Sequence, residues 1–151
     1  MQEFTTVDDI LDFAIKNEQD SYDLYTRLAG EMKNPGTRKF FEDMAREELG
    51  HKARLMDVKK GKYLEPDTKK VMDLKIADYL VDVDPESEMN YSKALVFAMK
   101  AEKAEFKLYV DLADRTTNED VAKTLMFLAQ EEAKHKLKLE IEYDENVLRE
   151  G

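Results

Sequence analysis

The sequence predicts an all-α protein, a four-helix bundle built from two repeated helix hairpins. Apolar residues recur at alternating steps of four and three through most of the 151 residues, which is the spacing of one face of an α-helix. The chain also repeats itself, because residues 10–56 align with 94–140 without a gap and share 17 identities in 47 positions. The absence of tryptophan, with only five glycines and three prolines, further favours helices over strands.

We expect helices at about 6–32, 37–60, 87–115 and 118–148. The connection at 61–86 is too long for a tight turn, and its segment VMDLKIADYL (71–80) suits a short helix. A single domain spanning 1–151 would then contain hairpin repeats at about 6–60 and 87–148, joined by this long crossover between the second and third helices.

The expected helix ends have recognisable capping chemistry. A threonine followed three residues later by an aspartate is typical of a helix N-terminus, and glycine is typical just beyond a C-terminus. The positions concerned are Thr6 with Asp9, Thr117 with Asp120, the break at Pro35 and Gly36, Gly61 after the second helix, and Asp84, Pro85 and Ser87 before the third.

The row of apolar residues along each expected helix, here called its seam, is interrupted near its middle by a gap of polar residues. The only two histidines of the chain close the same pattern, Glu48-x-x-His51 and Glu132-x-x-His135, at an offset of 84 residues. Two further glutamates, Glu18 and Glu102, lie on the other two helices at the same offset. Residues three apart project from one helix face, so each pair can reach one ion.

These gaps predict a centre for two metal ions. Four carboxylates balance two divalent cations, whereas buried ionised groups without cations would each cost several kcal/mol. Carboxylates mixed with imidazoles suit iron or manganese, with zinc and cobalt as other possible occupants.

Several neighbouring residues have more than one interpretation. Glu105 lies on the seam three residues after Glu102, where the first repeat has Ser21; we favour direct or switchable metal ligation, the alternative being a hydrogen bond to a ligand. Tyr25 and Tyr109 are expected to donate hydrogen bonds to ligand carboxylates, with no support for a redox role. Two glutamates are expected on the surface, Glu47 and Glu131. The methionines are expected in apolar packing (Met32, Met44, Met56, Met99, Met126).

Composition limits the classes of function. A formal net charge of −10 argues against nucleic-acid binding, which needs a positively charged surface to contact the phosphates. Without cysteine the chain forms no disulfide, zinc ribbon or iron–sulfur cluster. The N-terminal MQEFTTVDDILDF has no basic region or long apolar stretch, so we expect neither a signal peptide nor a membrane anchor, and a cytoplasmic location.

These residues resemble the rubrerythrin branch of the ferritin-like di-iron carboxylate proteins. The resemblance covers essentially the whole chain, and Glu102-x-x-Glu105 favours rubrerythrin over a generic ferritin. It implies two iron ions, with Glu48 and Glu132 as bridging carboxylates. By the same resemblance, Glu18 and His51 would complete one iron site, and Glu102 and His135 the other. Glu105 would exchange with His51 as the irons change oxidation state, and is the candidate catalytic residue.

The resemblance also implies an activity. Rubrerythrins reduce hydrogen peroxide with electrons relayed through an iron bound by four cysteines, which these 151 residues lack. We therefore expect a peroxide- or dioxygen-reducing enzyme that receives electrons from an external, rubredoxin-like donor and forms a homodimer. Three alternatives stay open: a ferroxidase or iron-handling protein, a manganese centre that disproportionates peroxide, and a bundle with a structural or sensing metal.

Overall fold

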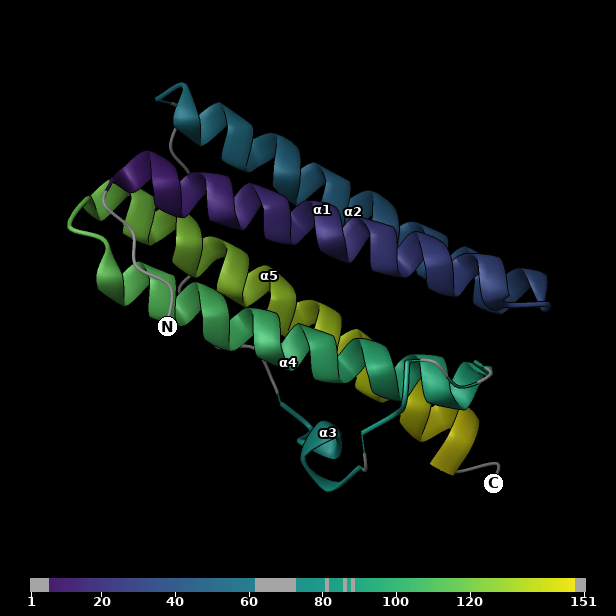
Figure 1. The fold of residues 1–151 in the computed structure, drawn as a ribbon. Coiled ribbons are helices and arrows are strands. Elements are labelled where there is room, and N and C mark those ends of the chain that lie inside the picture. The colour runs from purple at the N-terminus through teal and green to yellow at the C-terminus, as the bar shows by residue number, and fades with distance from the viewer. Residues whose placement is uncertain (1–5, 62–72, 81, 86, 88, 149–151) are drawn as a thin grey trace.

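Four long helices form the protein, and they are arranged as two antiparallel hairpins (Figure 1). The computed structural model describes residues 6–61, 73–80, 82–85, 87 and 89–148. The helices are α1 (Val7–Glu31), α2 (Pro35–Lys59), the one-turn α3 (Ile76–Tyr79), α4 (Tyr91–Arg115) and α5 (Glu119–Tyr143), which continues as a π-helix over Asp144–Leu148. Close packing of α1 with α2, and of α4 with α5, confirms the predicted bundle of two hairpins joined by a crossover.

The first hairpin begins and ends as its capping residues predict. Thr6 and Asp9 form a reciprocal capping box, in which each side chain accepts from the other's backbone N–H. Gly61 has φ of +94°, the left-handed conformation that glycine adopts without strain. The second helix starts at Pro35 rather than residue 37, because the Asn34 side chain caps it and proline suits the first helical position.

Both long helices of the second hairpin start within four residues of the predicted positions, but their capping residues differ from the predicted ones. The third long helix begins at Tyr91, not at residue 87, because Ser87 donates its N–H to the carbonyl of Asp84 in a turn. The fourth is capped by Asn118, whose side chain accepts from Val121 N at 3.1 Å, and not by Thr117. Asparagine at a cap offers a carbonyl oxygen on a short side chain, so it competes well with a neighbouring threonine.

The crossover contains the short helix expected within residues 71–80. Of that segment, 73–80 are described, and α3 occupies Ile76–Tyr79; the stretch 62–72 lies outside the described residues. Buried Glu140 on α5 accepts from the backbone N–H groups of Leu74 and Ala77 at 3.3 and 3.1 Å. Lys136 donates to the same carboxylate at 3.0 Å. This cluster attaches the crossover to the second hairpin.

The interior has two apolar clusters with a polar layer between them. One cluster includes Phe41, Met44 and Leu95, and the other includes Leu11 and Leu125. The apolar residues on the inner face of each long helix are buried or half-buried. The packing interpretation of one methionine is wrong, because Met56 is 46% exposed on the outer side of α2. In the part of the chain that is described, each helix is too short or too polar to cross a bilayer.

Candidate metal centre

The polar layer brings together all seven residues that the sequence predicts as metal ligands. They come from all four long helices, and each is at most 7% exposed. By helix they are Glu18 on α1, Glu48 and His51 on α2, Glu102 and Glu105 on α4, and Glu132 and His135 on α5.

Six of the seven form two overlapping groups, in each of which one ligand atom per residue lies within 4.8 Å of the others. Both groups contain Glu48 and Glu132, which therefore can be shared by two ions. The first group is completed by Glu18 and His51, and the second by Glu102 and His135. These are the same bridging and terminal sets that the family resemblance implies; their ligand roles stay predictions.

Contacts between the hairpins follow a pseudo-twofold pattern. The Nδ1 of His51 lies 3.0 Å from Glu132 Oε1, and the Nδ1 of His135 lies 2.7 Å from Glu48 Oε1. Each histidine thus faces the glutamate on the opposite helix of the α2 and α5 pair. The rings are nearly parallel at 17°, with centroids 5.4 Å apart.

The tyrosine hydroxyls donate to carboxylates of the centre, as predicted. Tyr25 donates to Glu102 Oε1 at 2.5 Å, and Tyr109 donates to Glu18 Oε1 at 2.6 Å. Each hydrogen bond crosses between α1 and α4, so the tyrosines orient one carboxylate in each group. Both hydroxyls are buried, and burial followed by the charge of the bound glutamate raises the pKa of Tyr109 well above its ordinary value.

Glu105 lies beside the two groups and belongs to neither in this structure. Its Oε1 accepts hydrogen bonds from Ser21 Oγ and, at 3.1 Å, from Asn17 Nδ2. Its Oε2 is buried and has no hydrogen-bond partner. In this conformation Glu105 acts as a hydrogen-bonding residue, which is the alternative interpretation. Its unpartnered Oε2 is still available for the direct or switchable metal ligation that we favour.

Cations fit this donor set. Among the described residues, eight buried side-chain polar atoms make no hydrogen bond of suitable geometry. Seven of them belong to the centre: one oxygen each of Glu18, Glu102, Glu105 and Glu132, both oxygens of Glu48, and Nδ1 of His135, which approaches Glu48 only as an ion pair. An unpaired polar group in the interior is costly, so such atoms occur where a ligand satisfies them. Carboxylate oxygens with two imidazole nitrogens suit iron, manganese or zinc.

Comparison with known proteins gives the family. The rubrerythrin family model matches residues 9–143, which include every residue of the centre and all of the four long helices except the first two residues of α1. The chain belongs to the rubrerythrin family. No curated protein matches the sequence.

Two solved structures share the rubrerythrin-family fold of this chain. An uncharacterised conserved protein from Magnetospirillum magnetotacticum MS-1 is 23% identical, with a TM-score of 0.71 over 93% of this chain and 95% of its own. A hypothetical protein from Pyrococcus furiosus is 24% identical, with a TM-score of 0.65 over 93% and 89%. Likeness at this level of identity shows the fold of the bundle.

Burial and mutual repulsion distribute protons unevenly over the rubrerythrin-family centre. Burial raises the pKa of Glu48, Glu105 and Glu132 well above the ordinary value, and the negative charge of Glu102 raises all three further. Burial opposes ionisation of Glu102 too, but the adjacent Glu132 carboxyl and the positive charge of His135 lower its pKa. Burial disfavours charged His135, yet the nearby carboxylates of Glu102, Glu47 and Glu48 together outweigh this and raise its pKa. Bound cations would replace these protons.

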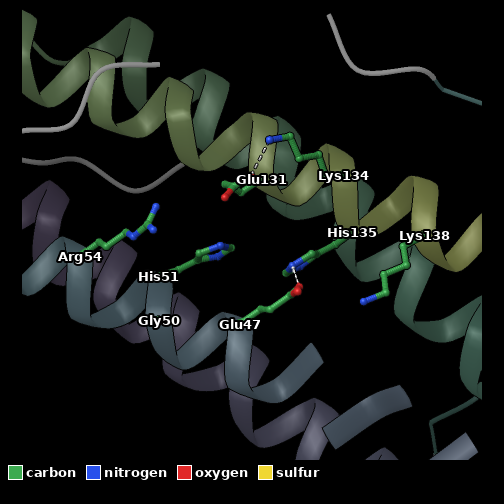
Figure 2. Close-up of a pocket in the computed structure, with 8 residues that line it drawn as sticks. All are labelled: Glu47, Gly50, His51, Arg54, Glu131, Lys134, His135 and Lys138. Atoms are coloured by element: carbon green, nitrogen blue, oxygen red, sulfur yellow. Dashed lines mark ion pairs between the residues drawn. The ribbon is translucent and has the colours of Figure 1, made fainter. Parts of the chain in front are cut away.

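Sequence reasoning missed one contact of the centre. Glu47 is 47% exposed, as a surface residue should be, but its Oε2 lies 2.5 Å from the outer ring nitrogen of His135, Nε2 (Figure 2). The interaction lowers the pKa of Glu47, mainly through the hydrogen bond from His135. The signal in the sequence is weak, because Glu47 lies one residue from the seam and its reach depends on the distance between α2 and α5.

Proposed function

We propose that this protein is a di-iron oxidoreductase that reduces hydrogen peroxide, or dioxygen, with electrons from an external donor. The observation that supports it is the pair of buried groups sharing Glu48 and Glu132, because shared carboxylates hold two cations close enough to act on one small substrate. The balanced peroxide reaction takes up two electrons and two protons and yields two water molecules. Two ferrous ions would supply the electrons and polarise the O–O bond.

The residues around the ions have separate tasks in this proposal. Tyr25 and Tyr109 fix the orientation of Glu102 and Glu18, which keeps both groups in a geometry suited to metal. Glu105 is held at Oε1 by Ser21, and burial raises the pKa of its carboxyl, which favours a proton on Oε2 while that oxygen is not bound to metal. It would deliver that proton from Oε2 to the departing oxygen.

The donor of electrons would be a separate protein. These 151 residues contain no cysteine, so a rubredoxin-type iron site has to be provided from elsewhere. A small iron protein of that type is the partner we propose, and a homodimer the assembly. Size-exclusion chromatography with light scattering tests the assembly, and reduction of the oxidised centre by rubredoxin tests the donor.

The decisive experiment is anaerobic reconstitution with ferrous iron, followed by rapid mixing with peroxide or with dioxygen. We expect two irons per chain and faster oxidation by peroxide. Oxidation that is faster with dioxygen would contradict peroxide reduction, and sustained turnover of added ferrous iron would identify a ferroxidase. Oxygen release without reductant by a manganese-loaded sample would identify a disproportionating enzyme. Metal that does not change its spectrum with either oxidant would identify a structural or sensing site.

A further inference from the structure

The outer nitrogens of the two histidines face a pocket of about 340 Å³ between α2 and α5 (Figure 2). Its lining follows the internal repeat, because each residue from α2 has a counterpart 84 positions later on α5. The pairs that matter here are Glu47 with Glu131, Gly50 with Lys134, and His51 with His135.

The carboxylates of this pocket break the twofold pattern. Glu47 crosses from α2 to the Nε2 of His135 at 2.5 Å. Its counterpart Glu131 instead pairs with Lys134 on its own helix, with Oε2 and Nζ 3.1 Å apart. Within the described part of the chain, no carboxylate lies within ion-pair distance of the Nε2 of His51. Figure 2 shows both pairs, with the ring of His51 standing apart.

One difference between the repeats explains the asymmetry. Lys134 follows Glu131 by three residues, a spacing that places opposite charges side by side on a helix. Gly50 stands at the same place after Glu47 and has no side chain to pair with it. Glu47 therefore remains free to reach across the pocket, whereas Glu131 is drawn back along α5.

We infer that Glu47 is a positioning residue that fixes the ring of His135, and that the exchange of Gly50 for Lys134 between the repeats restricts this support to one metal position. A carboxylate that accepts the Nε2–H keeps the proton there, leaves the Nδ1 lone pair for a cation and prevents ring rotation. The ring of His51 lacks that restraint. The inference rests on the di-metal centre of the proposed function, and not on its peroxide chemistry.

Stepwise cobalt(II) binding to the metal-free protein tests this, with cobalt as a spectroscopic substitute for ferrous iron. Glu47→Ala should weaken one of the two bound ions by about 10–100-fold, the usual effect of removing an imidazole's outer partner. The matched control Glu131→Ala removes the counterpart carboxylate and should leave both affinities within about twofold of the wild type.

A second variant alters the carboxylate's partner without removing the carboxylate. Gly50→Lys recreates the Lys134 spacing on α2, and a Cβ at Gly50 would meet no other atom within 4 Å. The new lysine should draw Glu47 away from His135 and weaken the same ion as Glu47→Ala does. Circular dichroism of the metal-free variants checks that the bundle is intact, which we expect because all these positions face solvent or the pocket.

Nuclear magnetic resonance of the cobalt protein gives a readout independent of activity. The shifted ring N–H of His135 should exchange slowly with solvent and that of His51 rapidly; Glu47→Ala should make both rapid. Equal exchange of the two rings in the wild type, or equal weakening by Glu47→Ala and Glu131→Ala, would overturn the inference. If the inference fails in one of these ways but the protein reduces peroxide, the proposed function stands. If the two ring N–H groups exchange at different rates but the protein does not reduce peroxide, the inference stands and the proposed function fails.

Discussion

Glu105 differs from the other buried carboxylates because its two oxygens have different surroundings. Oε1 is held by Ser21 and Asn17, whereas Oε2 is buried without a partner. In the internal repeat Ser21 is the counterpart of Glu105, so a small residue in one hairpin makes space for a long one from the other. That arrangement suits a proton carrier, because one end is oriented while the other stays available.

Glu105→Gln should separate metal binding from proton delivery. The amide keeps the size and the hydrogen-bonding oxygen but has no acidic proton, so we expect two bound irons and peroxide oxidation slowed by about 100-fold. Metal analysis and rapid mixing measure the two quantities. As a control, Ser21→Ala should slow the reaction much less, since it only loosens Oε1. An unchanged rate in Glu105→Gln would remove this residue from the mechanism.

At the scale of elements, the crossover depends on a buried carboxylate of α5. Glu140 is fully buried and binds two backbone N–H groups beside α3 together with the ammonium of Lys136. Lys136 also reaches Asp73 at 2.6 Å, so the same small cluster attaches the chain just before α3. A short helix of one turn is unstable alone, and these contacts provide the stability that its own hydrogen bonds lack.

Glu140→Ala should release the crossover and leave the hairpins folded. The change leaves the N–H groups of Leu74 and Ala77 unpaired, the second of them buried, and removes one partner of Lys136, so the free energy of unfolding should fall by about 2–4 kcal/mol. Urea unfolding measures the loss, and hydrogen exchange should be faster at Leu74 and Ala77 than in the wild type. Unchanged exchange at these two amides would show that other contacts attach the crossover. Glu145→Ala, at an exposed position of the π-helix that continues α5, is the control.

For the whole molecule, the centre joins the two hairpins where carboxylates from both sides meet. The apolar clusters lie on either side of this layer, so its charge acts directly on the association of the hairpins. The raised pKa values of Glu48 and Glu132 mean that, without metal, the folded protein holds protons that the unfolded chain releases at the same pH.

The stability of the metal-free protein should therefore fall as pH rises from about 5 to about 8. In this window the folded state binds more protons than the unfolded state, because the folded pKa values of Glu48 and Glu132 lie above the ordinary one. His135, whose pKa is also raised, acts in the same direction, and Glu102, whose pKa is lowered, completes its contribution below the window. Urea midpoints measured with a chelator follow this change.

Metal should reverse the trend, since cations take the place of the displaced protons and bind more tightly as pH rises. The stabilisation by ferrous iron or zinc should thus be larger at about pH 8 than at about pH 5. Glu48→Gln should flatten the metal-free profile and lose the metal effect. A metal-free protein that becomes more stable over this range would contradict the burial of ionisable carboxylates.

The sequence by itself determined the four helices, their buried faces and the candidate ligands. Helical spacing sets the direction of each side chain around the axis of its helix. Because the two repeats are offset by 84 residues, each inference about one hairpin applies to the other, so Glu18 and Glu102 could be placed with the histidines. Helix starts were less certain, because Asn90 and Asn118, whose side chains cap α4 and α5, compete with nearby alternatives. The tertiary structure alone decided that Glu47 reaches His135 and that Glu105 lies against Ser21. Those contacts depend on the distance between helices and on the side chains opposite, and no periodicity within one helix contains either quantity.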